Sequence, residues 1–153
     1  MQSIAIAIAI HSTVEDLFGE PSHRFSRALA LADGVLIDCS STAQEAGIVL
    51  PVAITAAAWA DCVGWSDADD QRKRGHTGQS ESARLWDVCW MASMAIRAAL
   101  RRGQDEAASL AFQLYRVPRD GRGIRPRLVT LLLLVGSGDT GEPVITILQP
   151  GED

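Results

Sequence analysis

The sequence predicts an α+β fold in which N-terminal helices pack on a C-terminal three-stranded antiparallel β-meander. The first observation behind this prediction is a change of period. Apolar residues recur with helical spacing up to residue 102, whereas residues 110–148 contain three β-rich runs joined by turn-rich connections. The second observation is size, because 153 residues with 47% hydrophobic content suit one core, so we expect a single domain over residues 1–153.

The N-terminal half carries local start and stop signals for each expected element. Isoleucine alternates with small residues over 4–10, which is the period of a strand, so the fold is expected to include an added N-terminal strand. Thr13 and Ser22 are N-cap residues, and Ser41 with Gln44 forms a capping box. The expected elements are a strand at 4–10, helices at 14–18 and 23–33, a β-like run at 35–39, a short helix ending at Gly47, and a buried helix from Pro51 to about Val63.

The C-terminal half is predicted to consist of one long helix and the meander. Ser80 caps a helix over residues 81–102, whose two apolar stripes indicate contact on two sides. We expect its two tryptophans, and the two on the preceding helix, to lie in the core. A polar loop over 66–79 precedes this helix. Strands are expected at 110–117, 128–135 and 144–148, joined by turns at 118–127 and 136–143.

The net charge of −5 is spread unevenly along the chain. Residues 1–70 carry a net charge of −8, residues 71–127 carry +7, and residues 128–153 carry −4. The acidic total argues against broad non-specific binding of DNA, but it leaves room for a local basic site.

The expected location is the cytoplasm. The three cysteines have no zinc or redox spacing and lie in apolar surroundings, which favours reduced thiols in a core. No apolar run reaches the roughly 18–20 residues of a spanning helix, and the apolar start lacks a basic region, so we expect neither a membrane partner nor a signal peptide.

Five arginines within twelve residues are the candidate partner-binding residues: Arg116, Arg119, Arg122, Arg125 and Arg127. A loop with projecting guanidinium groups suits phosphates or an acidic protein surface. The alternative is a solvated loop whose arginines pair with the acidic first half of the same chain.

Other candidate sites are weaker. The loop over 136–143 is glycine-rich, but it joins two strands, so a hairpin turn is expected rather than a phosphate or calcium site. The three histidines have no ligand spacing, so no metal or cofactor is expected. Asp61 and Asp87 each lie in an apolar helix, where a structural role is favoured over a catalytic one, and Arg84 is placed to pair with Asp87.

Several strings together resemble members of a known family: Val14-Glu15-Asp16-Leu17-Phe18-Gly19-Glu20, Ser26-Arg27-Ala28, Ala32-Asp33-Gly34-Val35-Leu36-Ile37-Asp38, Trp59-Ala60-Asp61-Cys62-Val63, Leu85-Trp86-Asp87-Val88, Arg116-Val117-Pro118-Arg119-Asp120-Gly121-Arg122, Gly141-Glu142-Pro143-Val144-Ile145-Thr146-Ile147 and Pro150-Gly151-Glu152-Asp153. The chain is similar over Val14 to Asp153 to a domain-of-unknown-function family of small bacterial proteins. The resemblance implies a setting on plasmids, phages and integrative elements, and it implies no catalytic residue.

The resulting expectation is a non-enzymatic accessory protein of a mobile element that binds a host protein or ribonucleoprotein complex, with an anti-CRISPR or other anti-defence inhibitor as the specific form. One alternative is a nucleic-acid-binding protein that uses the arginine-rich loop 116–127. The other is an enzyme acting on nucleic acid or nucleotides through Asp61, Asp87 or a histidine. The sequence makes no prediction of the oligomeric state.

Overall fold

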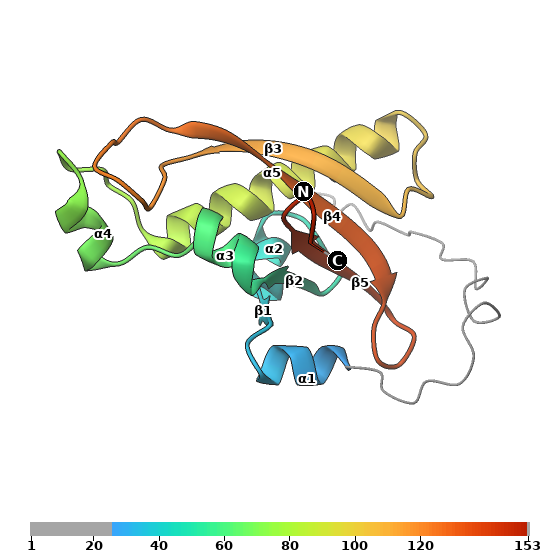
Figure 1. Cartoon of the computed structure of the whole chain (residues 1–153). Coiled ribbons are helices and arrows are strands. Elements are labelled where there is room, and N and C mark those ends of the chain that lie inside the picture. The colour runs from blue at the N-terminus through green and yellow to red at the C-terminus, as the bar shows by residue number, and fades with distance from the viewer. Residues whose placement is uncertain (1–25, 153) are drawn as a thin grey trace.

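The computed structural model of the chain describes residues 26–152 and has an α+β architecture (Figure 1). A five-stranded sheet is covered on one face by the long helix α5, which packs directly on β3, and α2 and α3 pack against α5 and β2. The predicted fold class is confirmed. The expected strand at 4–10 and helix at 14–18 lie outside the described residues.

The elements have the following bounds. The helices are α1 (Arg27–Ala32), α2 (Ser40–Glu45), α3 (Ala56–Cys62), α4 (Asp67–Arg72) and α5 (Glu81–Arg101). The strands are β1 (Leu36–Asp38), β2 (Val52–Thr55), β3 (Ser109–Arg116), β4 (Arg127–Ser137) and β5 (Pro143–Leu148).

The sheet is mixed, and its order is β1-β2-β5-β4-β3. The predicted meander is present, since β3 pairs antiparallel with β4 and β4 pairs antiparallel with β5. The prediction of three strands was wrong, because β2 adds to β5 in parallel and β1 adds to β2. The parallel pair joins residues more than ninety positions apart, and Ile54 stands beside Ile147.

The predicted helix from Pro51 to Val63 was wrong in its first half, where β2 stands instead. Val52 and Ile54 are fully buried in the core cluster, and β-branched side chains suit a buried strand. Thr55 then turns the chain into α3, because its side-chain oxygen accepts a hydrogen bond from the backbone N–H of Ala58. The polar and apolar pattern that follows Thr55 is helical, as expected.

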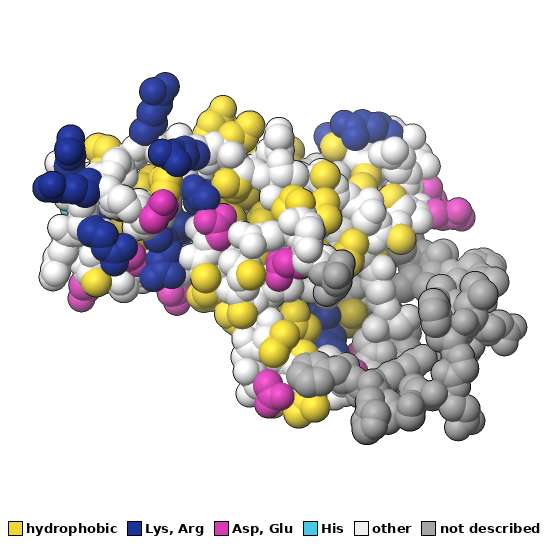
Figure 2. All heavy atoms as spheres, in the orientation of Figure 1, with side chains coloured by type: hydrophobic (Ala, Val, Ile, Leu, Met, Phe, Trp, Pro, Cys, Tyr) yellow, Lys and Arg dark blue, Asp and Glu magenta, His cyan; other side chains and the backbone are white. Residues whose placement is uncertain are grey.

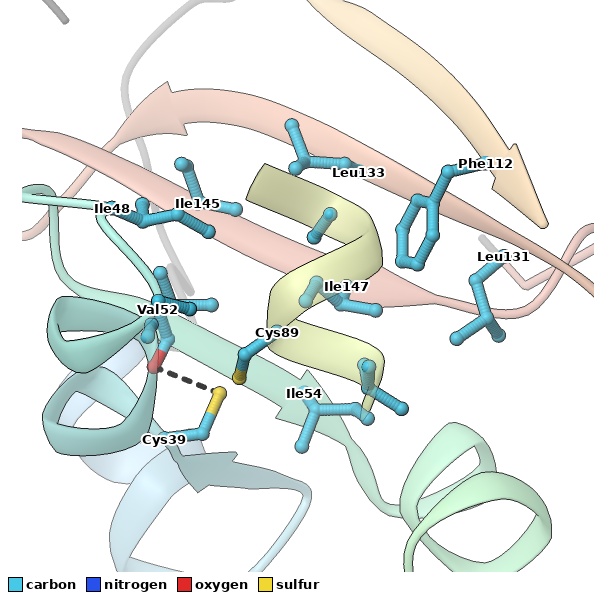
Figure 3. Packing of buried hydrophobic residues seen from close by; sticks show 14 of the residues in the cluster. Cys39, Ile48, Val52, Ile54, Cys89, Phe112, Leu131, Leu133, Ile145 and Ile147 are labelled. Atoms are coloured by element: carbon cyan, nitrogen blue, oxygen red, sulfur yellow. Dashed lines mark hydrogen bonds between the residues drawn. The ribbon is translucent and has the colours of Figure 1, made fainter. Parts of the chain in front are cut away.

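The long helix was predicted almost to the residue, and it seals the core. Ser80 caps it, and its buried face meets a cluster of sheet residues that includes Phe112, Leu133 and Ile147 (Figure 3). The placement of all four tryptophans in the core was wrong. Trp86 and Trp90 stack on each other with ring centroids 5.9 Å apart and are 37% and 39% exposed.

The predicted loop over 66–79 contains a helix, α4, so the prediction of a loop was wrong for Asp67–Arg72. Ser66 and Asp69 form a capping box, in which the Ser66 hydroxyl and the Asp69 carboxylate each accept a hydrogen bond from the backbone of the other residue. The turn over 136–143 is the hairpin that was predicted. Its Asp139 carboxylate accepts hydrogen bonds from the backbone N–H groups of Arg27 and Ala28, at the start of α1.

Candidate functional site

The five arginines of the β3–β4 connection fall into two groups. Arg116 forms an ion pair of 2.8 Å with Asp61, and Arg119 forms one of 3.0 Å with Asp69. The other three side chains, on Arg122, Arg125 and Arg127, are exposed and make no ion pair within residues 26–152. The alternative of internal pairing with the acidic first half therefore holds for two of the five.

The connection is held in place by the segment after α4. The ammonium of Lys73, which is buried, donates hydrogen bonds to the backbone carbonyls of Pro118, Asp120 and Gly121. Arg72 donates to the carbonyl of Arg119 at 3.2 Å, and the backbone N–H of Arg74 donates to the carbonyl of Arg122 at 3.1 Å. Hydrogen bonds from cationic donors are stronger than those between neutral groups, so these contacts hold the connection in place on the surface.

Asp69 ties α4 to this connection from the other side. Its carboxylate is 2% exposed and accepts hydrogen bonds from Arg119 and from Ser66. Burial raises the pKa of this carboxyl group, but the hydrogen bonds from Arg119 and Ser66 together outweigh burial and leave the pKa below its usual value. Asp69 is therefore a buried anion whose partner is an arginine of the candidate site.

The structure adds two exposed arginines to the three on the connection. We call Arg72, Arg74, Arg122, Arg125 and Arg127 the basic surface. Figure 2 shows Lys and Arg side chains gathered at the end of the molecule where Figure 1 places α4 and the β3–β4 connection. Guanidinium groups of this kind bind carboxylates and phosphates through paired N–H donors. Sequence reasoning missed Arg72 and Arg74, although the run Arg72-Lys73-Arg74 is visible in the loop it described.

A buried arginine that sequence reasoning assigned to a surface pair supports the base of the site. Arg84 is 3% exposed and donates hydrogen bonds of 2.9 to 3.1 Å to the carbonyls of Asp61, Val63 and Val117. Its guanidinium carbon also lies 4.9 Å from the ring centroid of Trp65. The predicted pair with Asp87 is not formed, because these carbonyls draw the guanidinium away from the helix surface. Arg84 joins α3, α5 and the end of β3.

A cavity of about 200 Å³ opens beside these residues, and Asp87, one of the acids of the enzyme alternative, lines it. Asp87 and Cys62 line the cavity together with Arg116. Asp61 does not line it and is paired with Arg116. Burial raises the pKa of Asp87, and burial followed by the charge of Asp61 raises the pKa of Cys62 to about 12. A thiol with that pKa is protonated at neutral pH, so it is a poor nucleophile.

Residues 26–152 contain no group of three His, Cys, Asp or Glu side chains placed to hold a metal ion. His76 is exposed, and the other two histidines lie outside the described residues. In the described residues, no helix combines the length and the apolar character needed to cross a membrane. All three cysteines are buried and unpaired, as predicted for Cys39, Cys62 and Cys89.

Comparison with known proteins gives one match. A family model described as a family of unknown function, DUF6573, matches residues 18–153. No curated protein and no solved structure matches the chain. The matched range includes α1 to β5 and therefore the whole basic surface, and it begins after the isoleucine-rich run at 4–10.

Proposed function

The chain belongs to the DUF6573 family of unknown function, and we propose that it is a non-enzymatic protein that binds an acidic partner through its basic surface. The observation that carries this proposal is the fixed position of the β3–β4 connection. Lys73 and Arg119 hold the connection in place. The side chains of Arg122, Arg125 and Arg127 are exposed on it and form no ion pair within the described residues. A loop already ordered by the fold loses less entropy on binding, which favours affinity.

The partner class that we propose is a host protein or ribonucleoprotein complex with an acidic or phosphate-bearing surface. The acidic remainder of the chain supports this choice over general DNA binding, because residues 1–70 and 128–153 together carry a net charge of −12 and repel a polyanion that extends beyond the basic surface. A partner with a limited anionic patch meets only the basic end of the molecule.

The finer form of the proposal concerns the biological setting. We propose that the protein is an accessory factor of a plasmid, phage or integrative element, and that its host complex is part of a defence system. An anti-CRISPR or related anti-defence inhibitor is the corresponding activity. The resemblance to a family of small bacterial proteins supports this setting by association, and the basic surface supplies a physical means of contact.

Binding to nucleic acid is the second candidate function, because the same guanidinium groups suit a phosphate backbone. The two candidates differ in salt dependence. A site that neutralises several phosphates loses affinity steeply as salt rises, with a slope of roughly −0.7 to −0.9 per phosphate on a log–log plot. A gel shift that is unchanged when Arg119, Arg122 and Arg125 become alanine removes this candidate.

The experiment that tests the lead proposal is affinity purification from a bacterial host with quantitative mass spectrometry. The test variant is R122A/R125A/R127A. Its matched control is S82D/Q104E/S137D, which changes the net charge by the same amount at exposed positions away from the basic surface. We expect the partner to be recovered with the wild type and the control and to be reduced at least tenfold with the test variant, since charged contacts contribute strongly at interfaces.

Two outcomes contradict the lead proposal. Equal recovery with the test variant and the wild type shows that the basic surface does not bind the partner. The setting is tested separately, by measuring phage or plasmid interference in cells that express the protein. Interference that is unchanged across CRISPR and restriction systems removes the anti-defence form of the proposal.

A further inference from the structure

The outer edge of β3 carries backbone groups without a partner. β3 is the last strand of the sheet, and Ala108 and Val135 form a hydrogen-bonded pair at its start. Pairs of this kind alternate along an antiparallel ladder, so Ala111, Gln113 and Tyr115 direct their N–H and C=O groups away from β4. Within residues 26–152 these groups make no hydrogen bond. An exposed edge of this length is a template for another strand.

A groove runs along this edge, between β3 and α5. One stretch has a volume of about 590 Å³ and is lined by Met94, Ala98 and Phe112, among others. The next stretch, of about 340 Å³, is lined by Trp90, Leu128 and neighbouring residues. Met91 and Gln113 line both stretches, so the groove is continuous. Eight residues of β3 span roughly 27 Å, which is the length of a short extended peptide.

The charged side chains that line the groove differ in sign between its two ends. Arg101 and Arg102 lie at the end where β3 begins, and Asp87 lies toward the end where β3 finishes. None of the three forms an ion pair within the described residues. A strand that runs antiparallel to β3 places its C-terminal end beside the two arginines and its N-terminal end beside Asp87. The charges therefore favour one direction for an added strand.

We infer that this groove binds an extended peptide as a sixth strand, antiparallel to β3, with a basic N-terminal end, apolar side chains at alternate positions and an acidic C-terminal end. The apolar side chains face the methionines and alanines of α5, and the backbone pairs with Ala111, Gln113 and Tyr115. Methionine side chains adapt to different partners, which suits a groove that recognises a peptide mainly through backbone hydrogen bonds and accepts apolar side chains of different shape.

A second copy of this chain fits the edge less well than a single peptide. Neighbouring strands lie about 4.8 Å apart, whereas packed helix axes need about 8–10 Å. Because α5 packs directly against β3, two copies joined edge to edge bring their α5 helices into conflict. An extended peptide brings no helix with it.

The test is selection of binders to the full chain from a library of random decapeptides displayed with free C-termini. We expect enriched peptides to alternate apolar and polar residues and to carry an acidic side chain at or next to the free C-terminus. A synthetic copy of the best peptide is then measured against Q113P and Q113T. The proline removes an N–H that points away from β4, so the fold is retained while strand addition is blocked. Binding is expected to weaken at least tenfold with Q113P and to persist with Q113T.

Further measurements separate the proposal from its rivals. R101E/R102E is expected to reverse the preference for an acidic C-terminal end. M94E, which places a charge in the apolar groove, is expected to weaken peptide binding and replaces Q113P as the test if Q113P does not fold. The inference is overturned if no peptide is enriched, if folded Q113P binds normally, or if the chain dimerises in a way that Q113P abolishes. Protection of the Ala111, Gln113 and Tyr115 amides from hydrogen exchange in the dilute, unliganded chain also overturns it, because the edge is then already filled. The R122A/R125A/R127A variant keeps peptide binding, so this inference and the proposed function fail independently.

Discussion

Replacement of Arg84 by alanine tests whether one buried guanidinium joins the two halves of the molecule. Arg84 donates to the carbonyls of Asp61 and Val63 at the end of α3, to Val117 after β3, and to the Gln79 side chain before α5. Alanine removes every one of these donors and opens space beneath the ring of Trp65. We therefore expect R84A to cause a large loss in the free energy of unfolding.

The magnitude follows from the three backbone carbonyls. Each buried acceptor left without a donor costs roughly 1–3 kcal/mol, and water entering the vacated space recovers part of that cost. The expected loss is about 3–5 kcal/mol in the free energy of unfolding, which is large for a single substitution. Lysine keeps the charge but presents one ammonium in place of a planar fork, so R84K is expected to fall between alanine and wild type.

Urea denaturation followed by circular dichroism measures this loss. With a slope of about 2 kcal/mol per molar urea, the midpoint of R84A is expected to fall by about 2 M. R101A is the matched control, because Arg101 lies on the same helix, is exposed and makes no ion pair in the described residues. Its change is expected to stay within about 0.5 kcal/mol. A midpoint for R84A within error of R101A refutes the argument that Arg84 joins α3, α5 and β3.

Three further predictions concern pH, backbone conformation and thiol chemistry. Because the folded pKa of Asp69 is depressed, its stabilisation is present above the unfolded value of about 4 and is lost as pH falls through the folded pKa; D69N should lack this part of the acid-induced loss in thermal melts. Gly47 has φ +99°, a conformation that disfavours a side chain, so G47A should lower the free energy of unfolding by about 1–2 kcal/mol in urea denaturation; an unchanged stability contradicts this backbone conformation. The three buried thiols should resist DTNB in the native chain and should all react in guanidinium; rapid native labelling contradicts their burial.

The elements that the sequence predicted well are those with a strong local signal. Ser80 at the start of α5 and Gly103 just beyond its end bound a long amphipathic pattern, and the structure agrees with both ends. The meander was also local, since each of its strands follows the previous one through a short turn. Local propensity and final structure coincide wherever the partner of an element is its neighbour in the chain.

The elements that the sequence predicted poorly depend on distant partners. Val52 to Thr55 continue into helical alanines, so their apolar pattern suits one buried helix. Pairing with β1 and with the distant strand β5 selects the strand instead. A four-residue strand has no period of its own that could reveal this. α4 is a different case, because the serine–aspartate spacing of its capping box was visible in the sequence and was read as loop.

The candidate site was predicted in part, for the same reason. The arginines of the β3–β4 connection were found by their density, but their division into anchors and exposed groups depends on where Asp61 and Asp69 lie in space. Arg72 and Arg74 join the surface because the segment 72–74 donates hydrogen bonds to carbonyls of the connection, from Arg72, from Lys73 and from the Arg74 backbone. No spacing rule places residues 72–74 beside residues 118–122.

Lysine and arginine have different places in the candidate site. The one lysine of the chain is buried, where a compact ammonium with three donors meets three carbonyl oxygens, whereas the exposed basic residues are arginines with planar forks. Anchoring and binding are thus carried by different side chains. Because the anchors fix the backbone, removal of Lys73 should weaken partner binding by releasing the connection, even though the ammonium is buried. Removal of Arg125 should weaken partner binding without releasing the connection. If K73A leaves partner binding intact while R125A weakens it, the fixed loop is not what makes the basic surface bind.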